Sequence, residues 1–273
     1  GKMSVPGVKN IIAIASGKGG VGKSTVAVNI ALALSLEGAN VGILDADIYG
    51  PSQPLMLGIP DQKPHADEKN RIYPLEAHGV RVMSMGFLIE EDSPVIWRGP
   101  MVMKALTQFL SETVWGDLDY LILDLPPGTG DAQLTIVQQV SLAGAVIVST
   151  PQDLALLDAR KGLQMFRKTD VPILGIIENM SYYECPSCNH RENIFDNGGG
   201  ERAAEKYEVP FLGSIPLDIK VRLGGDEGSP IVLSENEDPV AQAFKETARN
   251  VALQVAIINS SSPVSVPELK IIE

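Results

Sequence analysis

The ten residues SGKGGVGKST, Ser16–Thr25, set the interpretation of the whole chain. They follow a short apolar run, Ile11–Ala15, and they open a helical pattern, Lys23–Leu36. From Gly17 to Ser24 they satisfy the pattern G-x-x-x-x-G-K-[ST] of a phosphate-binding loop. Such glycines let successive backbone N–H groups turn toward phosphate oxygens, and the N-terminus of the following helix adds a favourable dipole. The stretch therefore predicts a nucleotide site; a glycine-rich turn without a ligand is the alternative.

The residues of this loop have different expected tasks. Lys23 would hold the β- and γ-phosphates of a nucleotide, and Ser24 would offer its hydroxyl group to Mg²⁺. Thr25 would lie near the α-phosphate. The other candidate residues of the loop cradle the phosphates through the turn itself: Gly19, Gly20, Val21 and Gly22.

Short apolar, β-branched runs alternate with longer helical patterns along the chain. The expected strands are Ile11–Ala15, Val41–Leu44, Val80–Met83, Tyr120–Leu123, Ala145–Ser149, Ile173–Ile177 and Phe211–Gly213. The expected helices are Lys23–Leu36, Met101–Val114, Ala132–Ser141, Leu154–Arg167, Gly200–Tyr207 and Pro239–Ile257. This alternation predicts an α/β fold with right-handed crossovers and a doubly wound, mostly parallel sheet. Ligands of such sheets bind at the carboxyl ends of the strands.

We expect one domain, residues 1–258, which includes a loop at about 182–200 that carries both cysteines. A chain of 273 residues is long enough for one large α/β domain, and its length alone does not require a second. The Pro-rich, polar stretch Gly58–Ala77 predicts a surface excursion. Residues 259–273 contain four serines and two prolines, which predicts a loose or extended tail.

The charge and the cysteine content limit the classes of function. A net charge of -12 argues against broad, sequence-independent binding of DNA or RNA, because such binding needs a dense basic face. No apolar run approaches the roughly 20 residues of a membrane span, so no membrane partner is expected. With two cysteines and no export signal, a reducing, cytoplasmic environment is expected.

Acidic residues end two of the expected strands. Asp45 and Asp47 lie in GILDADIYGPS, Gly42–Ser52, and Asp124 lies in YLILDLPPGTGD, Tyr120–Asp131. A carboxylate after a buried hydrophobic strand is the usual Walker B arrangement, which holds Mg²⁺ directly or through water. Asp124 is therefore the first candidate for this task. The alternative for any one of these residues is a helix cap or a turn former.

A second lysine inside the loop, Lys18, makes the motif more specific. The form K-G-G-x-G-K-S/T resembles the deviant Walker A motif of the P-loop NTPases in the MinD, ParA and nitrogenase iron protein class. The resemblance implies that Lys18 reaches across a dimer to the partner's nucleotide, where its charge would act as an arginine finger does. It also implies that Asp47 orients the attacking water and that Asp45 supports the Mg²⁺ shell.

The base is expected to be adenine. The N-K-x-D motif of Ras-type GTPases is absent, and IENMS, Ile177–Ser181, ends a late strand instead. The amide of Asn179 can both donate to and accept from a base edge. In the class that the loop resembles, this Asn binds adenine and the loop at Pro216 lies against it, so the cofactor would be ATP. A turn-forming Asn is the alternative.

The two cysteines, Cys185 and Cys188, form a C-P-S-C motif in the stretch ECPSCN. A redox pair of the thioredoxin type would lie at a helix N-terminus early in a βαβ unit, whereas this pair lies in a late loop. A zinc site within one chain would be incomplete, because only His190 is near. Two chains related by a two-fold axis would supply four thiolates to one centre. Both a [4Fe–4S] cluster and Zn²⁺ accept such ligation.

Several further stretches make the resemblance narrower. The chain resembles the Mrp/ApbC family of ATP-binding iron–sulfur cluster carriers in DADIYGPS, WRGPM, LDYLILDLPPGTGD, ENMSYYECPSC and GGDEGSPIV. This resemblance implies a homodimer that bridges a [4Fe–4S] cluster, transfers it to apo iron–sulfur proteins and hydrolyses ATP slowly. Many bacterial members carry a small N-terminal domain first, so a short or shortened form is expected. The competing hypothesis is an ATP-dependent dimerisation switch like ParA or MinD, with structural Zn²⁺ at the cysteines.

Overall fold

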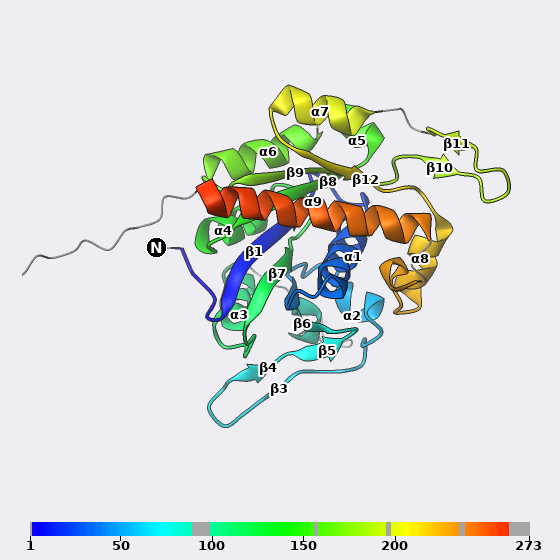
Figure 1. Cartoon of the computed structure of the whole chain (residues 1–273). Helices are drawn as coiled ribbons and strands as arrows, with labels where there is room; N and C mark the ends of the chain where they lie inside the picture. The colour runs from blue at the N-terminus through cyan, green and yellow to red at the C-terminus, as the bar shows by residue number, and fades with distance from the viewer. Residues whose placement is uncertain (1, 89–98, 156–157, 195–197, 235–237, 262–273) are drawn as a thin grey trace, which may run out of the picture.

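A computed structural model describes residues 2–88, 99–155, 158–194, 198–234 and 238–261. These residues form one eight-stranded sheet with the order β12-β9-β8-β1-β7-β2-β6-β5 (Figure 1). Its strands are β1 (Val8–Ala15), β2 (Val41–Asp45), β5 (Leu75–Ala77), β6 (Val80–Ser84), β7 (Leu118–Asp124), β8 (Gly144–Ser149), β9 (Ile173–Glu178) and β12 (Phe211–Ser214). All neighbouring strands pair in parallel except β5 and β6. The predicted doubly wound, mostly parallel sheet is confirmed.

The strand order reverses direction at β1. From β1 the chain crosses to β2 on one side, beyond β7, whereas β8, β9 and β12 follow one another on the other side. Such a reversal leaves a crevice at the carboxyl ends of the central strands. The loop Ser16–Thr25 begins at this point, directly after β1.

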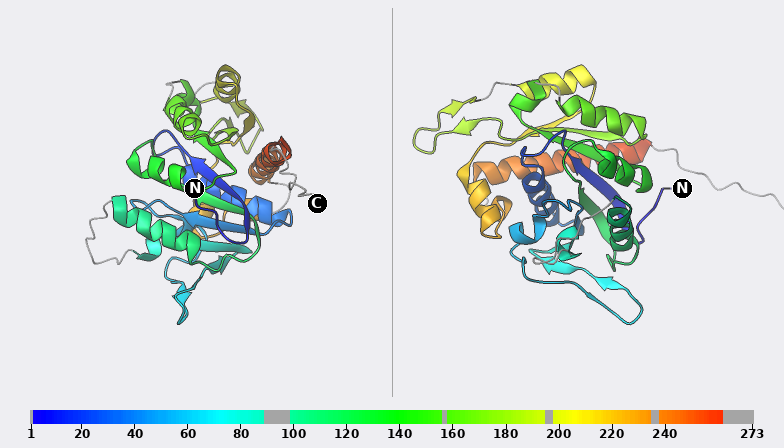
Figure 2. Two further views of the ribbon diagram at one scale, coloured as in Figure 1. Left: turned by 90° about the vertical axis from the view of Figure 1, so that its left-hand side faces the viewer. Right: turned by 180° about the vertical axis from the view of Figure 1, so that it is seen from behind.

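Helices cover both faces of the sheet (Figure 2). One face carries α1 (Lys23–Leu36) and α9 (Pro239–Ser261); the opposite face carries α3 (Gly99–Ser111), α4 (Asp131–Gln139), α6 (Asp158–Lys168) and α7 (Gly199–Tyr207). Successive side chains of β1 therefore enter different cores: Ile12 and Ile14 pack on the α1 side, and Ala13 packs on the α3 side. Because both faces are covered, the central strands are apolar almost throughout, as parallel strands usually are.

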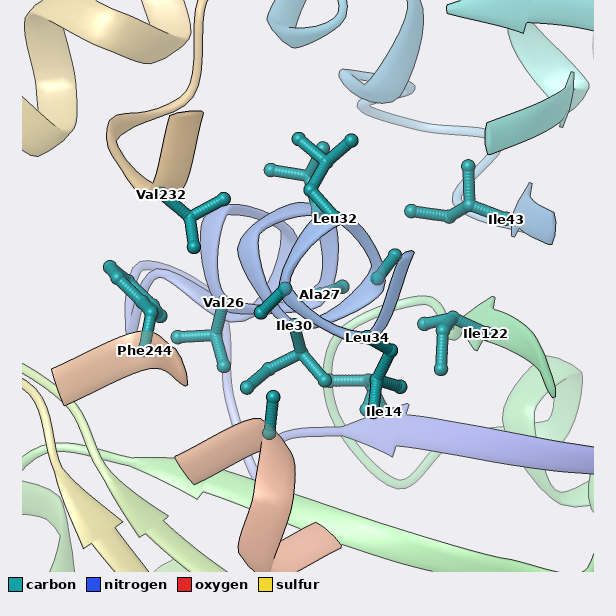
Figure 3. Close-up of a cluster of buried hydrophobic side chains, with 14 of the residues drawn as sticks. Ile14, Val26, Ala27, Ile30, Leu32, Leu34, Ile43, Ile122, Val232 and Phe244 are labelled. Carbon is teal, nitrogen blue, oxygen red and sulfur yellow. The ribbon is translucent and has the colours of Figure 1, made fainter. Parts of the chain in front are cut away.

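Helix α1 is enclosed on all sides. Every residue from Val26 to Leu34 is buried, and Figure 3 shows both the strand that carries Ile14 and the α9 segment that carries Phe244 beside the helix. Ile30 of α1 and Phe244 of α9 belong to one core cluster that also contains residues of the sheet, so this cluster joins α1 to both the sheet and α9. The buried polar residue Asn29 is satisfied, because its amide donates to Thr25 O at 2.9 Å and accepts from Val232 N at 3.1 Å. The predicted bounds of this helix match those in the structure.

Three predicted helices differ from the structure by three residues or more at one end, and one of them is Met101–Val114, which is observed as α3 and ends at Ser111. The stretch Leu154–Arg167 was expected as one helix, but α5 (Pro151–Ala155) begins earlier and α6 follows, with residues 156–157 outside the description. The last helix was expected to end at Ile257, but α9 continues to Ser261. The hydroxyl groups of Ser260 and Ser261 both donate to Ile257 O at 2.8 Å, so they satisfy a carbonyl group of the last turn. Residues 259–261, expected as part of the tail, are therefore helical, and residues 262–273 lie outside the description.

The polar excursion Gly58–Ala77 contains strands that the sequence pattern did not predict. Strands β3 (His65–Ala66) and β4 (Ile72–Tyr73) form a small antiparallel hairpin, and β5 adds an edge to the main sheet. The rings of His65 and Tyr73 stack with their centroids 4.9 Å apart. Strands of two or three residues are too short to show a period of two, and this explains the omission.

No helix among the residues with described positions combines the length and apolarity that crossing a membrane requires.

The enclosure of α1 predicts a large loss of stability when its core is truncated. We expect Ile30→Ala to lower the free energy of unfolding by about 2–5 kcal/mol, because the side chain is fully buried and its removal leaves a cavity. Leu253→Ala, on the outer face of α9 and 55% exposed, should change it by no more than about 0.5 kcal/mol. Urea denaturation of both variants measures the difference; equal losses would mean that α1 is not the shared core element.

Candidate functional site

The phosphate-binding loop surrounds a cavity of about 290 Å³ at the carboxyl end of β1. Its lining combines the loop with the segments that follow β2 and β7: Ser16, Lys18, Gly19, Gly20, Val21, Gly22, Lys23, Ser24, Thr25, Asp47, Ser52, Met56 and Pro127. Gly20 and Gly22 have φ angles of 81° and 78°, in the left-handed region that favours glycine. A Cβ atom on Gly22 would also lie 2.3 Å from Asn179 Nδ2. The loop backbone therefore requires glycine at this position for two independent reasons.

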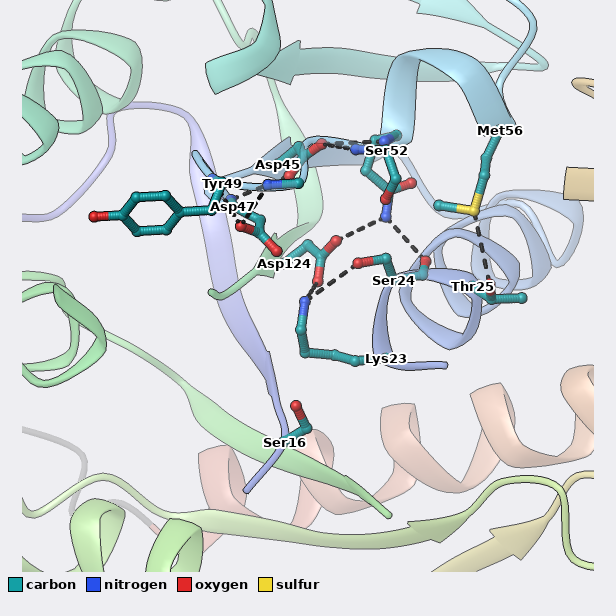
Figure 4. Close-up of polar contacts among 12 residues, drawn as sticks. Ser16, Lys23, Ser24, Thr25, Asp45, Asp47, Tyr49, Ser52, Met56 and Asp124 are labelled. Atoms are coloured by element: carbon teal, nitrogen blue, oxygen red, sulfur yellow. Dashed lines mark hydrogen bonds and ion pairs between the residues drawn. The ribbon is translucent and has the colours of Figure 1, made fainter. Parts of the chain in front are cut away.

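A buried ion pair lies at the start of α1. The ammonium group of Lys23 contacts Asp124 Oδ1 and lies 3.3 Å from Ser24 Oγ (Figure 4). Lys23 and Asp124 are both buried, so each charge depends on the other for compensation. A carboxylate and a hydroxyl group that share one cation are suitable donors for Mg²⁺. The residues present therefore fit the predicted magnesium site.

Asp45 ends β2 directly beside Asp124 on β7 and Ser84 on β6, because the parallel register aligns the three strand ends. Its oxygens accept hydrogen bonds from Ser52 N at 2.9 Å, from Asp47 N at 3.1 Å and from Ser84 Oγ at 3.2 Å. Burial, followed by repulsion from Asp124, raises the pKa of Asp45 to about 7. A second carboxylate thus lies next to the candidate magnesium ligand in a nearly dry environment.

Asp47 lies closer to the cavity. One of its oxygens, Oδ1, accepts from the backbone N–H groups of Tyr49 and Gly50, each at 3.1 Å, and this fixes the carboxylate. Its side chain lines the same cavity as Lys18 and Ser24. The structure brings Asp47 to the phosphate loop, and its role toward the attacking water stays a prediction.

Gln53 is a residue of this site that the sequence analysis missed. It begins the four-residue helix α2 (Gln53–Met56) and is fully buried. Its side-chain Nε2 donates to Asp124 Oδ2 and to Ser24 O, each at 2.9 Å. No local pattern indicates such a contact, since a single Gln after a turn is typical of an exposed helix start.

Lys18 is paired within its own chain. Its ammonium group contacts Asp153 Oδ1 of α5, and Asp153 is buried and also accepts from Thr150 Oγ1 at 2.9 Å. The Lys18 side chain itself is about half exposed. The sequence resemblance implies that Lys18 reaches across a dimer to the partner's nucleotide. This movement would require the ion pair between Lys18 and Asp153 to break.

Asn179 and Pro216 lie where β9 and β12 end. The amide of Asn179 donates to Val21 O at 2.9 Å, so it holds the phosphate loop, and its backbone N–H donates to Ser149 O at 2.7 Å. Pro216 is buried in a segment that continues the pairing of these strands, with Leu217 N donating to Tyr182 O at 2.7 Å. Their contacts with a base stay predictions.

The cysteines lie at the tip of a hairpin that projects from the body near α8 (Ile219–Asp226) (Figure 1). Strands β10 (Tyr183–Glu184) and β11 (Arg191–Glu192) pair in antiparallel fashion, and Cys185 N donates to His190 O at 2.9 Å. The predicted loop therefore contains a short hairpin. Residues 195–197 of the loop, like Trp97 and Arg98 of the WRGPM stretch, lie outside the description.

The turn between these strands favours the thiolate form of Cys185. Hydrogen bonds from the backbone N–H groups of Ser187 and then Cys188 lower the pKa of the Cys185 thiol. Cys185 is half-buried and Cys188 is exposed. Within the described part of the chain, no group of three or more His, Cys, Asp or Glu residues could hold a metal ion.

The doubly wound sheet and the two-lysine phosphate loop define a P-loop NTPase of the MinD and ParA class. A family model described as ParA, NUBPL iron-transfer P-loop NTPase matches residues 7–252. The chain belongs to this family, and the resemblance found in the sequence is confirmed.

Individual relatives agree with this assignment. An iron–sulfur cluster carrier protein of Haemophilus influenzae is 56% identical over 252 residues, which cover 92% of this chain and 68% of that protein. A nucleotide-binding protein of Archaeoglobus fulgidus, solved in complex with ADP, is 39% identical with a TM-score of 0.75, over 87% of this chain and 92% of that one. The MinD protein of Pyrococcus horikoshii, solved with Mg-ADP, is 27% identical with a TM-score of 0.67, over 91% and 98%.

The contact between Gly22 and Asn179 predicts a dependence that a double-mutant cycle can measure. Ala at Gly20 meets only the backbone penalty of the left-handed region, about 1–2 kcal/mol, because nothing lies within 4 Å of its Cβ atom. Ala at Gly22 meets this penalty and also displaces the Asn179 amide, so we expect it to lower the free energy of unfolding further, by about 1–3 kcal/mol.

In an Asn179→Ala background the additional loss should vanish, because the methyl group then meets no amide. Thermal or urea unfolding of the four variants measures it. An additional loss that persists without Asn179 would show that the clash is not its cause.

The raised pKa of Asp45 predicts a pH dependence of stability. In the unfolded chain this carboxyl ionises near its ordinary pKa of 3.8, whereas in the folded protein its pKa is about 7. Between these values the folded state keeps a proton that the unfolded chain has lost, so the free energy of unfolding contributed by Asp45 falls as the pH rises from about 4 to about 7. The full contribution corresponds to roughly 4 kcal/mol.

When the free energy of unfolding is plotted against pH, Asp45→Asn should remove this contribution to the slope. The variant should also be less stable at every pH, because it loses hydrogen bonds. Urea denaturation in Mg²⁺-free buffer between about pH 4 and pH 8 compares the two slopes. Parallel curves for the two proteins would contradict the assignment.

Proposed function

We propose that this protein is an ATP-dependent carrier of iron–sulfur clusters, in which two copies hold one [4Fe–4S] cluster as cargo and pass it to apo-proteins. The observation that carries the proposal is the projecting hairpin at the nucleotide end of the sheet, whose tip carries an exposed and a half-buried thiol. The name of the Haemophilus influenzae relative favours the same function over a positioning switch of the MinD type.

Sharing between two chains follows from the number of ligands. A tetrahedral thiolate site needs four sulfurs, and each chain has only Cys185 and Cys188. A two-fold axis near the hairpin tips would bring both pairs together without further ligands. The backbone N–H groups that lower the pKa of Cys185 favour the thiolate, which is the form that binds iron.

ATP is expected to bind with its phosphates in the glycine loop and with Mg²⁺ between Ser24 and Asp124. Mg²⁺ bound there supplies positive charge to the phosphate oxygens. Lys23 would then leave Asp124 and turn to the β- and γ-phosphates, Asp47 would orient the attacking water, and Asp45 would support the cation from the side. Hydrolysis is expected to be slow, because Lys18 acts only when a partner chain is in place.

The connection between the two sites is short. Asn179 is bonded to the phosphate loop through Val21 O, and the chain runs from Asn179 to Cys185 within one segment. The base of that segment is fixed, since Glu178 accepts from the Ser181 hydroxyl group and from the N–H group of Gly200 at the start of α7. Asn179 is thus the contact through which a change in the loop on hydrolysis would reach the hairpin, and this supports a coupling of nucleotide state to cluster retention.

Removal of one thiol tests the cargo. After anaerobic reconstitution we expect about four irons and four sulfides per dimer, with broad absorption near roughly 400 nm, for the unaltered protein. Cys185→Ser should lose the cluster and keep its fold. Ser187→Ala is the matched control, because it lies between the cysteines and keeps both thiols and its backbone N–H group.

Metal and acid-labile sulfide analysis with solution mass decides the outcome. Zinc at about one per dimer and no sulfide after reconstitution would overturn the carrier proposal in favour of a zinc-clasped switch.

Because Lys18 is paired with Asp153 in its own chain, we expect dimerisation to include the cost of breaking this ion pair. Asp153→Asn removes the charge that holds Lys18, so ATP-dependent dimerisation should become about 3- to 10-fold tighter, a modest effect because Lys18 is half exposed. Lys18→Ala should weaken it instead. Analytical ultracentrifugation with ATP and Mg²⁺ measures both. A weaker dimer of Asp153→Asn would argue against a role of Lys18 in the partner's site.

A further inference from the structure

Gln53 joins three parts of the nucleotide site that are distant in sequence. Its backbone N–H donates to Asp45 Oδ2 at 3.0 Å, and its side-chain Nε2 donates both to Asp124 Oδ2 and to Ser24 O at 2.9 Å. The residue thereby connects the ends of β2 and β7 with the first turn of α1. It is fully buried, so these contacts do not compete with solvent.

The orientation of the amide is determined by its partners. Both the carboxylate of Asp124 and the backbone carbonyl of Ser24 can only accept hydrogen bonds, so only the NH₂ end of Gln53 satisfies them. Its carbonyl oxygen, Oε1, is buried and has no hydrogen-bond partner among the described residues. Such a group costs about 1–3 kcal/mol, and an apolar side chain of the same size would avoid this cost but leave Asp124 Oδ2 without its donor. The value of the amide therefore lies in the two acceptors that it holds, Asp124 and Ser24.

The two oxygens of Asp124 have different neighbours. Oδ2 faces Gln53, and Oδ1 faces the ammonium group of Lys23, on the side of the Ser24 hydroxyl group. When Lys23 turns toward a phosphate, Oδ1 loses its cation, but Oδ2 keeps its neutral donor. The carboxylate then cannot rotate freely, and Oδ1 stays directed toward Ser24. A neutral amide achieves this without adding a positive charge that would repel Mg²⁺.

We propose that Gln53 is a positioning residue of the magnesium site, which holds Asp124 and the first turn of α1 so that one carboxylate oxygen and the Ser24 hydroxyl group meet the cation together. This inference rests on the magnesium-dependent nucleotide site of the proposed function and extends it to a residue outside the phosphate loop. Hydrogen-bonding partners of metal ligands typically change metal affinity by about 10- to 100-fold when they are removed.

The test compares nucleotide binding with and without magnesium. The affinity of a fluorescent ADP analogue is measured in Mg²⁺ and in EDTA, for the unaltered protein, for Gln53→Leu and for Gln53→Asn. Leu keeps the volume and removes the amide, and Asn keeps an amide that is one methylene too short to reach both acceptors. In EDTA we expect the affinity of both variants for the analogue to lie within about 2-fold of that of the unaltered protein. The gain from Mg²⁺, which is the ratio of the affinity in Mg²⁺ to the affinity in EDTA, should be about 10-fold smaller in both variants.

Gln133→Leu is the matched control. Gln133 of α4 is also buried, and neither of its amide atoms has a hydrogen-bond partner among the described residues. Its replacement should leave the gain from Mg²⁺ unchanged, which separates the role of Gln53 from a general effect of buried amides.

Three outcomes would overturn the proposal. An unchanged gain from Mg²⁺ in both Gln53 variants would show that Asp124 does not need the amide. Equal losses in Mg²⁺ and in EDTA would assign Gln53 to the structure of the loop instead. If Mg²⁺ did not raise the nucleotide affinity of the unaltered protein, the proposed magnesium site would be wrong, and so would the role of Gln53. The cluster proposal would be unaffected, because iron and sulfide analysis tests it separately.

Discussion

The buried ion pair between Lys23 and Asp124 is the constraint on which the nucleotide site depends. A lone carboxylate at this depth would cost several kcal/mol, so the fold must always supply a positive charge to Asp124. Lys23 supplies it in this structure, and in the proposed function a metal ion takes over that task when Lys23 turns to the phosphates. The neighbouring Asp45 stays mostly protonated below neutral pH because the same small, dry region cannot easily hold a second negative charge. Compensation of charge thus links the loop, both strand ends and the nucleotide.

The rest of the architecture keeps these groups in register. Parallel pairing of β2 with β7 sets Asp45 directly beside Asp124, and the reversal of strand order at β1 places the glycine loop at the same edge. On the far side of β1, Asn179 holds the loop from the end of β9, which also leads to the cysteine hairpin. The candidate nucleotide site and the cysteine hairpin therefore share one edge of one sheet, and the short segment after β9 connects them.

Much of this could be predicted from the sequence because its signals are local. The strand–loop–helix of the phosphate loop and the bounds of α1 follow from spacing and apolarity within a few residues. The contacts of Gln53 and the pairing of Lys18 with Asp153 could not be predicted, since they depend on side chains that meet only after the strands are aligned. The start of α5 at Pro151 and the small strands β3 to β5 were missed for another reason: short elements carry too few residues to show a period.

The enclosure of α1 has a consequence for how the protein is made. The helix that carries Lys23 and Ser24 near the start of the chain is covered by α9, which lies close to the end of the described chain. While the ribosome is still synthesising the middle of the protein, one side of this apolar helix has no partner, and a chain in that condition is prone to aggregation. The packing of α1 can therefore be completed only after α9 has left the exit tunnel, so the helix behind the phosphate loop gains its full support late in synthesis.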